Sequence, residues 1–181
     1  VGTTRHAGDF TMPNMLYGKV VRAGIPHARI LRLDASRARS LSGVVSVLTG
    51  SDLVGGQIVT DLPGQTGQKR LSTDQSVLAT EHVRFEGEAI ALIAAESREI
   101  AEQAAQLIDV EYEPLPVVRD IHAAMEPGAP EIQPVNNLVS EYHVNRGDIE
   151  AGFAQADLVV ENTYYVPFIE QAYLEPEVGL A

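Results

Sequence analysis

The sequence predicts an α+β fold in which a mixed sheet carries a few helices packed on it. Two strand-like runs, Leu16 to Arg22 and Ala28 to Leu33, stand beside a clear amphipathic helix. A third observation is the uninterrupted apolar run from Ala89 to Ala95, which has the composition of a strand buried on both faces. This run is therefore expected at the centre of the sheet.

The first half of the chain is predicted to form two strands, a short helix and a third strand. Gly24-Ile25-Pro26 separates the two leading strands and is typical of a hairpin or of the start of a crossover. Asp34 can cap a helix over Ala35 to Leu41, and Val44 to Leu48 is a β-branched strand candidate. Residues 55–76 are polar and rich in Gly and Gln, which predicts a long loop.

The second half contains the clearest helix. Ser97 is placed as its N-cap, and the apolar residues that follow lie at helical spacing on one core-facing stripe: Ile100, Ala101, Ala104, Leu107 and Ile108. Val110 and Tyr112 then alternate with acidic residues, which predicts a strand with one face in water. Pro116 to Pro134 has little periodicity and is predicted to be a surface connection.

Proline, glycine and changes in periodicity divide the chain into three parts. We expect an N-terminal arm over residues 1–13, the main α+β domain over 14–134, and a separate C-terminal region over 135–181. The last region is predicted as strand, helix and strand, with the strands over Val139 to Arg146 and Leu158 to Val166. Because the chain begins without Met and stops in strand-like sequence, we expect its natural ends to lie elsewhere.

Composition favours a globular, cytoplasmic protein that binds neither nucleic acid nor membrane. The chain has 13 basic and 25 acidic residues, a net charge of −12, which opposes the counterion displacement on which nucleic-acid binding depends. Apolar residues make up 45% of the chain, enough for a core, yet the longest apolar run is far shorter than a membrane span. The absence of cysteine excludes disulfides, a thiol nucleophile and cysteine-ligated metal or iron–sulfur sites within these residues.

No catalytic constellation emerges from the residues alone. The five histidines are too widely spaced to indicate zinc, and His27, in the turn between the first strands, is expected to fix that corner through a backbone hydrogen bond. Three pairs of glutamates two residues apart could each place two carboxylates on one strand face: Glu86 with Glu88, Glu111 with Glu113, and Glu175 with Glu177. We interpret the first pair as a tight turn and the second as the solvent face of a strand.

Several separated motifs nevertheless occur in an order that resembles one enzyme superfamily. They are Met-Leu-Tyr-Gly-Lys-Val-Val-Arg at 15–22, Pro-His-Ala-Arg-Ile at 26–30, Leu-Ser-Gly-Val-Val-Ser-Val-Leu-Thr-Gly at 41–50, Val-Arg-Phe-Glu-Gly-Glu at 83–88, Ile-Asp-Val-Glu-Tyr-Glu-Pro at 108–114, and Arg-Gly-Asp at 146–148. Together they resemble the α/β hammerhead domain at the N-terminal end of the molybdopterin-binding large subunit of xanthine dehydrogenase, aldehyde oxidase and related molybdenum hydroxylases.

The resemblance implies an oxidoreductase that inserts water-derived oxygen into a C–H bond of a heterocycle or an aldehyde. It implies molybdopterin with molybdenum, 2Fe-2S clusters and FAD in the holoenzyme, and it implies as partners the remainder of the large subunit and iron–sulfur and FAD subunits or domains. The cofactor-contacting segments and the catalytic glutamate of such enzymes lie further along the large subunit. No catalytic, cofactor-binding or metal residue is therefore assigned here, and these 181 residues are expected to be inactive alone.

Two weaker expectations concern contacts. The tail from Glu170 to Glu177 leads toward the cofactor domain in such enzymes, so Gln171 and Glu175 are candidates for contact with that domain. A domain separated from its partners should also expose apolar surface, which predicts self-association. The alternative hypothesis is a free-standing module that binds a small ligand through the loop at 55–76. An open reading frame that ends at Ala181 would favour this alternative.

Overall fold

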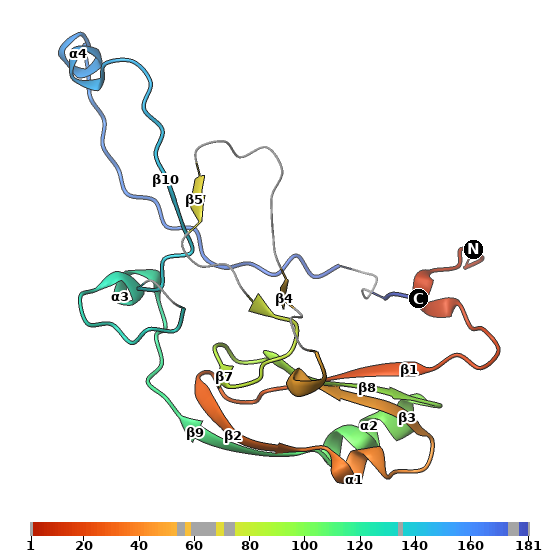
Figure 1. The fold of residues 1–181 in the computed structure, drawn as a ribbon. Coiled ribbons are helices and arrows are strands. Elements are labelled where there is room, and N and C mark those ends of the chain that lie inside the picture. The colour runs from red at the N-terminus through yellow and green to blue at the C-terminus, as the bar shows by residue number, and fades with distance from the viewer. Residues whose placement is uncertain are drawn as a thin grey trace. The chain divides into compact units, whose positions relative to one another are not determined.

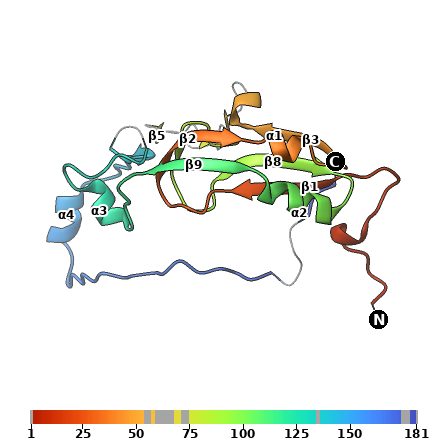
Figure 2. The same cartoon turned by 90° about the horizontal axis from the view of Figure 1, so that it is seen from below.

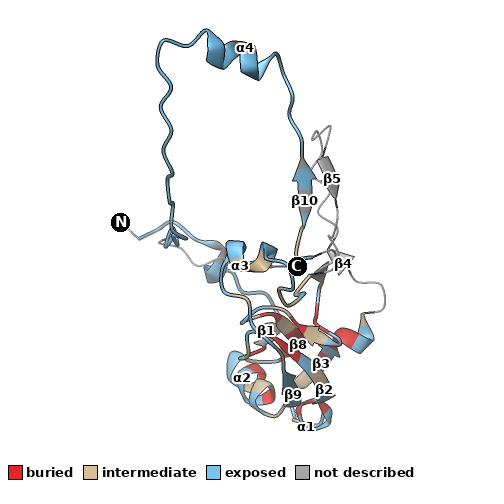
Figure 3. Ribbon diagram, turned by 90° about the vertical axis from the view of Figure 1, so that its left-hand side faces the viewer, coloured by how far each residue is buried: buried red, intermediate tan, exposed pale blue. Residues whose placement is uncertain are grey.

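The computed structural model describes residues 2–53, 57–58, 68–70, 75–133, 136–173 and 178–180. The chain divides into two compact units, Asn14–His143 and Val1–Pro13 with Val144–Ala181. They are called the core unit and the terminal unit below. Every buried apolar side chain among the described residues belongs to the core unit, and Figure 3 shows this burial concentrated in its strands and helices.

One three-stranded antiparallel sheet of the core unit has the order β1-β8-β3. Its strands are β1 (Tyr17–Arg22), β8 (Ala89–Ala95) and β3 (Val44–Thr49), so the apolar strand lies at the centre, as predicted. The helices α1 (Ser36–Arg39) and α2 (Arg98–Gln106) pack against this sheet (Figure 1). Ser97 caps α2 by accepting a hydrogen bond from the backbone N–H three residues later, which confirms the predicted N-cap.

The second three-stranded sheet of the core unit has the order β7-β2-β9. It consists of β7 (His82–Val83), β2 (Ala28–Asp34) and β9 (Asp109–Pro114), and Figure 2 shows β2 and β9 side by side. Because β1 and β2 lie in different sheets, the turn at Gly24-Ile25-Pro26 begins a crossover and does not close a hairpin. The predicted α+β class is confirmed, but all the described ladders are antiparallel. A parallel pair needs a crossover that returns to the same sheet, whereas α2 connects β8 in one sheet to β9 in the other.

The core consists of two clusters of buried side chains. The first fills the space between the β1-β8-β3 sheet and the two helices with small and medium residues: Ala35, Ala38, Val47, Ile93, Ala95, Ala101 and Ala104. The second lies at the other end of β8 and contains Ala23, Ala79, Val83 and Ile90. Apolar burial of this kind is the main favourable contribution to folding, and here it depends on β8, which supplies residues to both clusters.

The predicted loop at 55–76 contains three short strands. β4 (Gln57–Ile58) pairs with β6 (Gln75–Ser76), and β5 (Gln68–Arg70) pairs with β10 (Ser140–Tyr142). The rest of this predicted loop lies outside the described residues, namely 55–56, 59–67 and 71–74. The strand predicted from Val139 to Arg146 is confirmed only over β10, because only those residues have a pairing partner among the described residues.

The predicted surface connection contains a helix that the sequence did not reveal. It is α3 (Ile121–Met125), which begins where Asp120 Oδ1 accepts hydrogen bonds from the N–H groups of His122 and Ala123. No residue of α3 is buried, and although Ile121, Ala124 and Met125 have helical spacing, one turn is too short for this apolar periodicity to predict a helix. The N-cap is the local signal that could have identified it.

The terminal unit has little regular structure. Its elements are a 3₁₀ turn at Ala7–Asp9 and α4 (Ile149–Ala154), which is the helix expected between the two predicted strands. α4 begins after Asp148, whose Oδ1 accepts from Ala151 N–H at 3.0 Å. The strand predicted over Leu158 to Val166 is wrong for this structure. These residues are exposed and make no ladder, because no described segment pairs with them. No helix among the described residues is long and apolar enough to span a membrane.

Candidate functional site

His27 lies at the corner between β1 and β2, and its side chain binds the backbone of the segment that follows β9. The residue is only 7% exposed, and its Nδ1 lies 2.6 Å from the carbonyl oxygen of Pro116, to which the ring donates. The His27 carbonyl in turn accepts from Leu115 N–H at 3.0 Å. The prediction that His27 fixes this corner through a backbone hydrogen bond is confirmed.

The glutamates of the first pair do not share a face. Glu86 is exposed, whereas Glu88 is 2% exposed and directs its side chain back into its own turn. Glu88 Oε2 accepts from Arg84 N–H at 2.6 Å, while Oε1 lies 3.9 Å from Arg84 Nη1 and has no hydrogen-bond partner within the part of the chain that the structure describes. Gly87, between them, has φ of +89°. The carboxylate therefore stabilises the tight turn, as we interpreted this pair.

The second pair of glutamates belongs to a row of ion pairs between β2 and β9. Glu113 Oε2 lies 2.9 Å from Arg29 Nη2, and Glu111 Oε2 lies 4.0 Å from Arg32 Nε. Arg32 also donates to Asp109, and this hydrogen bond is the largest cause of the raised pKa of Arg32. All these side chains are about half exposed or more, so each pair contributes little to stability. The predicted solvent face is confirmed.

Sequence reasoning missed Asn137, which lies three residues beyond the predicted connection and makes four side-chain hydrogen bonds. Its Oδ1 accepts from the N–H groups of Ile132 at 2.6 Å and Gln133 at 3.0 Å. Its Nδ2 donates to the carbonyl oxygens of Ala124 and Pro130, both at 3.0 Å. Asn137 has φ of +63°, a conformation that asparagine tolerates better than most residues. The available signal was the pair Asn136-Asn137 shortly after Pro134, because asparagine is typical of turns with positive φ.

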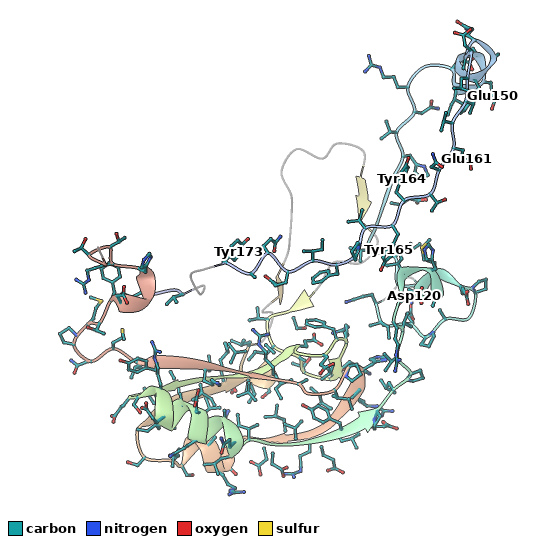
Figure 4. The ribbon with its side chains drawn as sticks, turned by 180° about the vertical axis from the view of Figure 1, so that it is seen from behind. Asp120, Glu150, Glu161, Tyr164, Tyr165 and Tyr173 are labelled. Atoms are coloured by element: carbon teal, nitrogen blue, oxygen red, sulfur yellow. The ribbon has the colours of Figure 1, made fainter. Side chains whose placement is uncertain are left out.

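The predicted contacts with a cofactor domain stay predictions. Gln171 is exposed and lies in the extended tail of the terminal unit, and Glu175 lies outside the described residues, as does Glu177. Figure 4 shows Tyr164, Tyr165 and Tyr173 along the same tail. Tyr164, Tyr165 and Tyr173 are 83%, 88% and 68% exposed, so this tail presents apolar rings to solvent.

Charge in the C-terminal third does not suit an anionic cofactor. Molybdopterin carries a phosphate group, and proteins hold phosphate with Arg, Lys and backbone N–H donors. From residue 130 onward the chain has one such side chain, Arg146, against nine acidic residues. In the described residues no group of three or more His, Cys, Asp or Glu could hold a metal ion. Arg146 is therefore the one cationic side chain of this segment that could pair with the cofactor phosphate.

Hollows of about 440 and 350 Å³ flank α3 within the core unit. Their polar side chains do not converge, since the Asp120 carboxylate caps α3 and the Asn137 amide is fully hydrogen-bonded. Most of the loop at 55–76, which the alternative hypothesis requires as a ligand site, lies outside the described residues. No described contact favours that alternative.

The geometry thus defines an α+β domain in which His27 and Glu88, both buried, hydrogen-bond to backbone groups of the core unit. Residues 1–116 match the family described as aldehyde oxidase and xanthine dehydrogenase, a/b hammerhead domain, and residues 130–181 match the molybdopterin cofactor-binding domain. The chain belongs to the aldehyde oxidase and xanthine dehydrogenase family of molybdenum-containing oxidoreductases. This confirms the family resemblance and the hammerhead fold predicted from the motifs.

Named relatives agree with this assignment. The chain is 34% identical to the nicotinate dehydrogenase large molybdopterin subunit of Eubacterium barkeri over 100% of its own length and 40% of that protein. It is 33% identical to the xanthine dehydrogenase molybdenum-binding subunit of Escherichia coli O157:H7, covering 99% of this chain and 24% of that protein. Its fold matches the aldehyde oxidoreductase of Desulfovibrio gigas with a TM-score of 0.70 and 33% identity, over 87% of this chain and 18% of the other. The chain spans less than half the length of these relatives.

Proposed function

We propose that this chain is the N-terminal structural and subunit-contacting part of the large subunit of a molybdenum hydroxylase, and that it contributes no catalytic residue of its own. The observation that carries the proposal is the use of the buried polar groups. His27 and Glu88 are the buried groups capable of acid–base chemistry in the described core. The His27 ring donates to a backbone carbonyl, and Glu88 accepts from a backbone N–H through Oε2 while its Oε1 lies 3.9 Å from the Arg84 guanidinium.

The proposal includes the holoenzyme around this chain. When bound, molybdopterin supplies the redox chemistry that oxidises a heterocycle or an aldehyde, and 2Fe-2S clusters and FAD accept the electrons. The partners are the remainder of the large subunit and the subunits or domains that hold those centres. Relatives named as a molybdenum-binding subunit and as subunit gamma of a dehydrogenase complex support partners of this kind. We also propose an arm at 1–13, the hammerhead domain at 14–134 and the start of the cofactor-binding region at 135–181.

The direct test compares the 181-residue chain with the full-length gene product that contains it. We expect stoichiometric molybdenum and turnover of a purine, nicotinate or an aldehyde only in the full-length protein, because the acidic C-terminal third offers one cation for the cofactor phosphate. The measurements are elemental analysis and an oxidation assay with an artificial electron acceptor. Molybdenum or turnover in the 181-residue chain contradicts its inactivity, and a full-length protein without molybdenum contradicts the hydroxylase function.

Self-association of the 181-residue chain is a second expected result. Val166 and Phe168 are 82% and 99% exposed in the tail, and apolar surface of this kind favours association when no partner covers it. Sedimentation should show concentration-dependent oligomers that weaken in a Val166→Ser, Phe168→Ser variant. The matched control is Ile121→Ser, Met125→Ser, which removes exposed apolar surface from α3 instead. A chain that is monomeric at high concentration, or a control that weakens association equally, contradicts the role of the tail.

A further inference from the structure

The connection between the two family matches is a folded segment with defined contacts at both ends. The first match ends at residue 116 and the second begins at 130, while the core unit continues to residue 143. The first residues of the second match therefore belong to the same compact unit as the hammerhead sheets. In the following paragraphs the joint means residues 115–133 and 136–138.

The N-terminal end of the joint is tied to the sheet through His27. The ring donates to the Pro116 carbonyl oxygen and the His27 backbone accepts from Leu115 N–H, so two successive residues are held. The next residue along the chain, Ala28, is fully buried in β2. The anchor is consequently part of the sheet, and the connection cannot swing at this point without breaking both hydrogen bonds.

The C-terminal end of the joint is closed by Asn137. A carboxamide has two acceptor positions and two donors, and all four are used here, on partners at positions 124, 130, 132 and 133. The side chain therefore fastens the end of α3 to the beginning of the second family match. Two further hydrogen bonds close the same loop: Asn137 N–H donates to the Gln133 carbonyl, and Asn136 N–H donates to Glu131 Oε1, both at 3.1 Å.

Between these two ends the chain is also constrained. Asp120, labelled in Figure 4 at the start of α3, accepts two backbone hydrogen bonds through one oxygen. A flexible linker of about 20 residues would have an end-to-end distance that fluctuates around roughly 25 Å. The contacts at His27, Asp120 and Asn137 restrict that freedom at three points along the joint.

We propose that the joint is a rigid spacer that holds the start of the cofactor-binding region in a fixed place on the hammerhead domain, and that Asn137 is its positioning residue. Asn137 touches no substrate or cofactor in this role. It acts by holding the backbone from which the second match continues. The proposal goes beyond the proposed function and depends on it only for the identity of the region that follows.

The test uses the full-length protein and hydrogen exchange of backbone amides. In an Asn137→Ala variant, the amides of Ile132 and Gln133 lose their acceptor and should exchange about tenfold faster, while the amides of β8 keep the wild-type rate. Asn136→Ala is the matched control. Asn136 is the neighbouring asparagine and also has positive φ, at +55°, but its side chain makes no hydrogen bond within the described residues. The control should leave the exchange at Ile132 and Gln133 unchanged.

Two results overturn the proposal: an Asn137→Ala variant with unchanged exchange at Ile132 and Gln133, or an equal increase in both variants. If Asn137→Ala also accelerates exchange in β8, the decisive variant is Asn137→Asp, which keeps an accepting oxygen and loses both donors. It should protect Ile132 and Gln133 better than alanine does, and equal exchange in the two variants also overturns the proposal. Exchange is measured without reference to molybdenum or turnover, so failure of the joint and failure of the proposed function are distinguishable.

Discussion

Replacement of Ile90 by alanine is expected to lower the free energy of unfolding of the 181-residue chain by about 4 kcal/mol. Ile90 is 2% exposed and lies in β8, where its side chain completes the second core cluster with Ala79 and Val83. Most of its neighbours in that cluster are already small or β-branched, so the cluster has few long side chains with which to refill the space. The loss would be a large fraction of the stability of an ordinary domain.

Ile121 provides the matched control for this experiment. It carries the same side chain but is 75% exposed at the start of α3. Ile121→Ala should change the free energy of unfolding by less than about 0.5 kcal/mol. Urea unfolding monitored by circular dichroism measures both variants. A loss of unfolding free energy in Ile90→Ala that is no greater than the loss in Ile121→Ala would show that β8 is not packed as described.

A Gly50→Ala variant is expected to lose about 1–3 kcal/mol through overpacking. Gly50 is buried at the start of the 3₁₀ turn Gly50–Asp52, directly after β3. An added Cβ would overlap the methyl group of Thr80 and would lie 2.9 Å from the carbonyl oxygen of Ala79. The methyl group could move, but the carbonyl oxygen belongs to the backbone and accommodates the new atom only if the chain shifts.

Two further variants separate backbone crowding from the general effect of replacing a glycine. Gly24→Ala is the control, because an added Cβ there meets no atom within 4 Å, and it should leave stability unchanged. Thr80→Ser in the Gly50→Ala background removes the crowded methyl but leaves the Ala79 carbonyl in place, so recovery should be partial. Thermal unfolding reports the differences. Full recovery would show that the backbone contact at Ala79 is not limiting.

Local signals in the sequence were sufficient for the elements whose formation is decided locally. α2 was predicted correctly because its cap at Ser97 and its apolar stripe agree. β8 was predicted as the central strand because a run without polar residues needs burial along its length. The partners of β1 and β2 could not be predicted, since both are suitable strands and the choice between sheets depends on residues far away in the chain.

The segment from Leu158 to Val166 shows the limit of composition as evidence. It has the β-branched and aromatic content of a strand, yet a strand also needs a partner, and no described segment supplies one. α3 shows the opposite case, in which a short helix forms inside a connection rich in Pro and Gly, where Asp120 caps its first turn. Composition alone predicts neither result.

The candidate site was predictable where a residue interacts within its own turn or ladder. His27 was expected to fix a corner because it lies in the turn between two strands. Glu111 and Glu113 were expected on the solvent face because they alternate with apolar residues along a strand. The burial of Glu88 was not predictable, because it depends on how the turn packs against the end of β1. Asn137 was missed for a related reason. Its four partners are backbone groups, which every residue carries, so no complementary side chain in the sequence marks Asn137 as a hydrogen-bonding centre.

The helices α1 and α2 approach each other and the sheet through alanines, of which Ala38 and Ala104 are fully buried. Glycine, the one smaller residue, costs about 1 kcal/mol relative to alanine inside a helix, so variation toward a smaller side chain weakens the helices themselves. Variation toward larger side chains would separate two helices that are closely packed. Side-chain volume at these positions is therefore limited from above by the spacing of the helices and from below by the stability of each helix. Over evolutionary time this double limit favours alanine where the two helices meet.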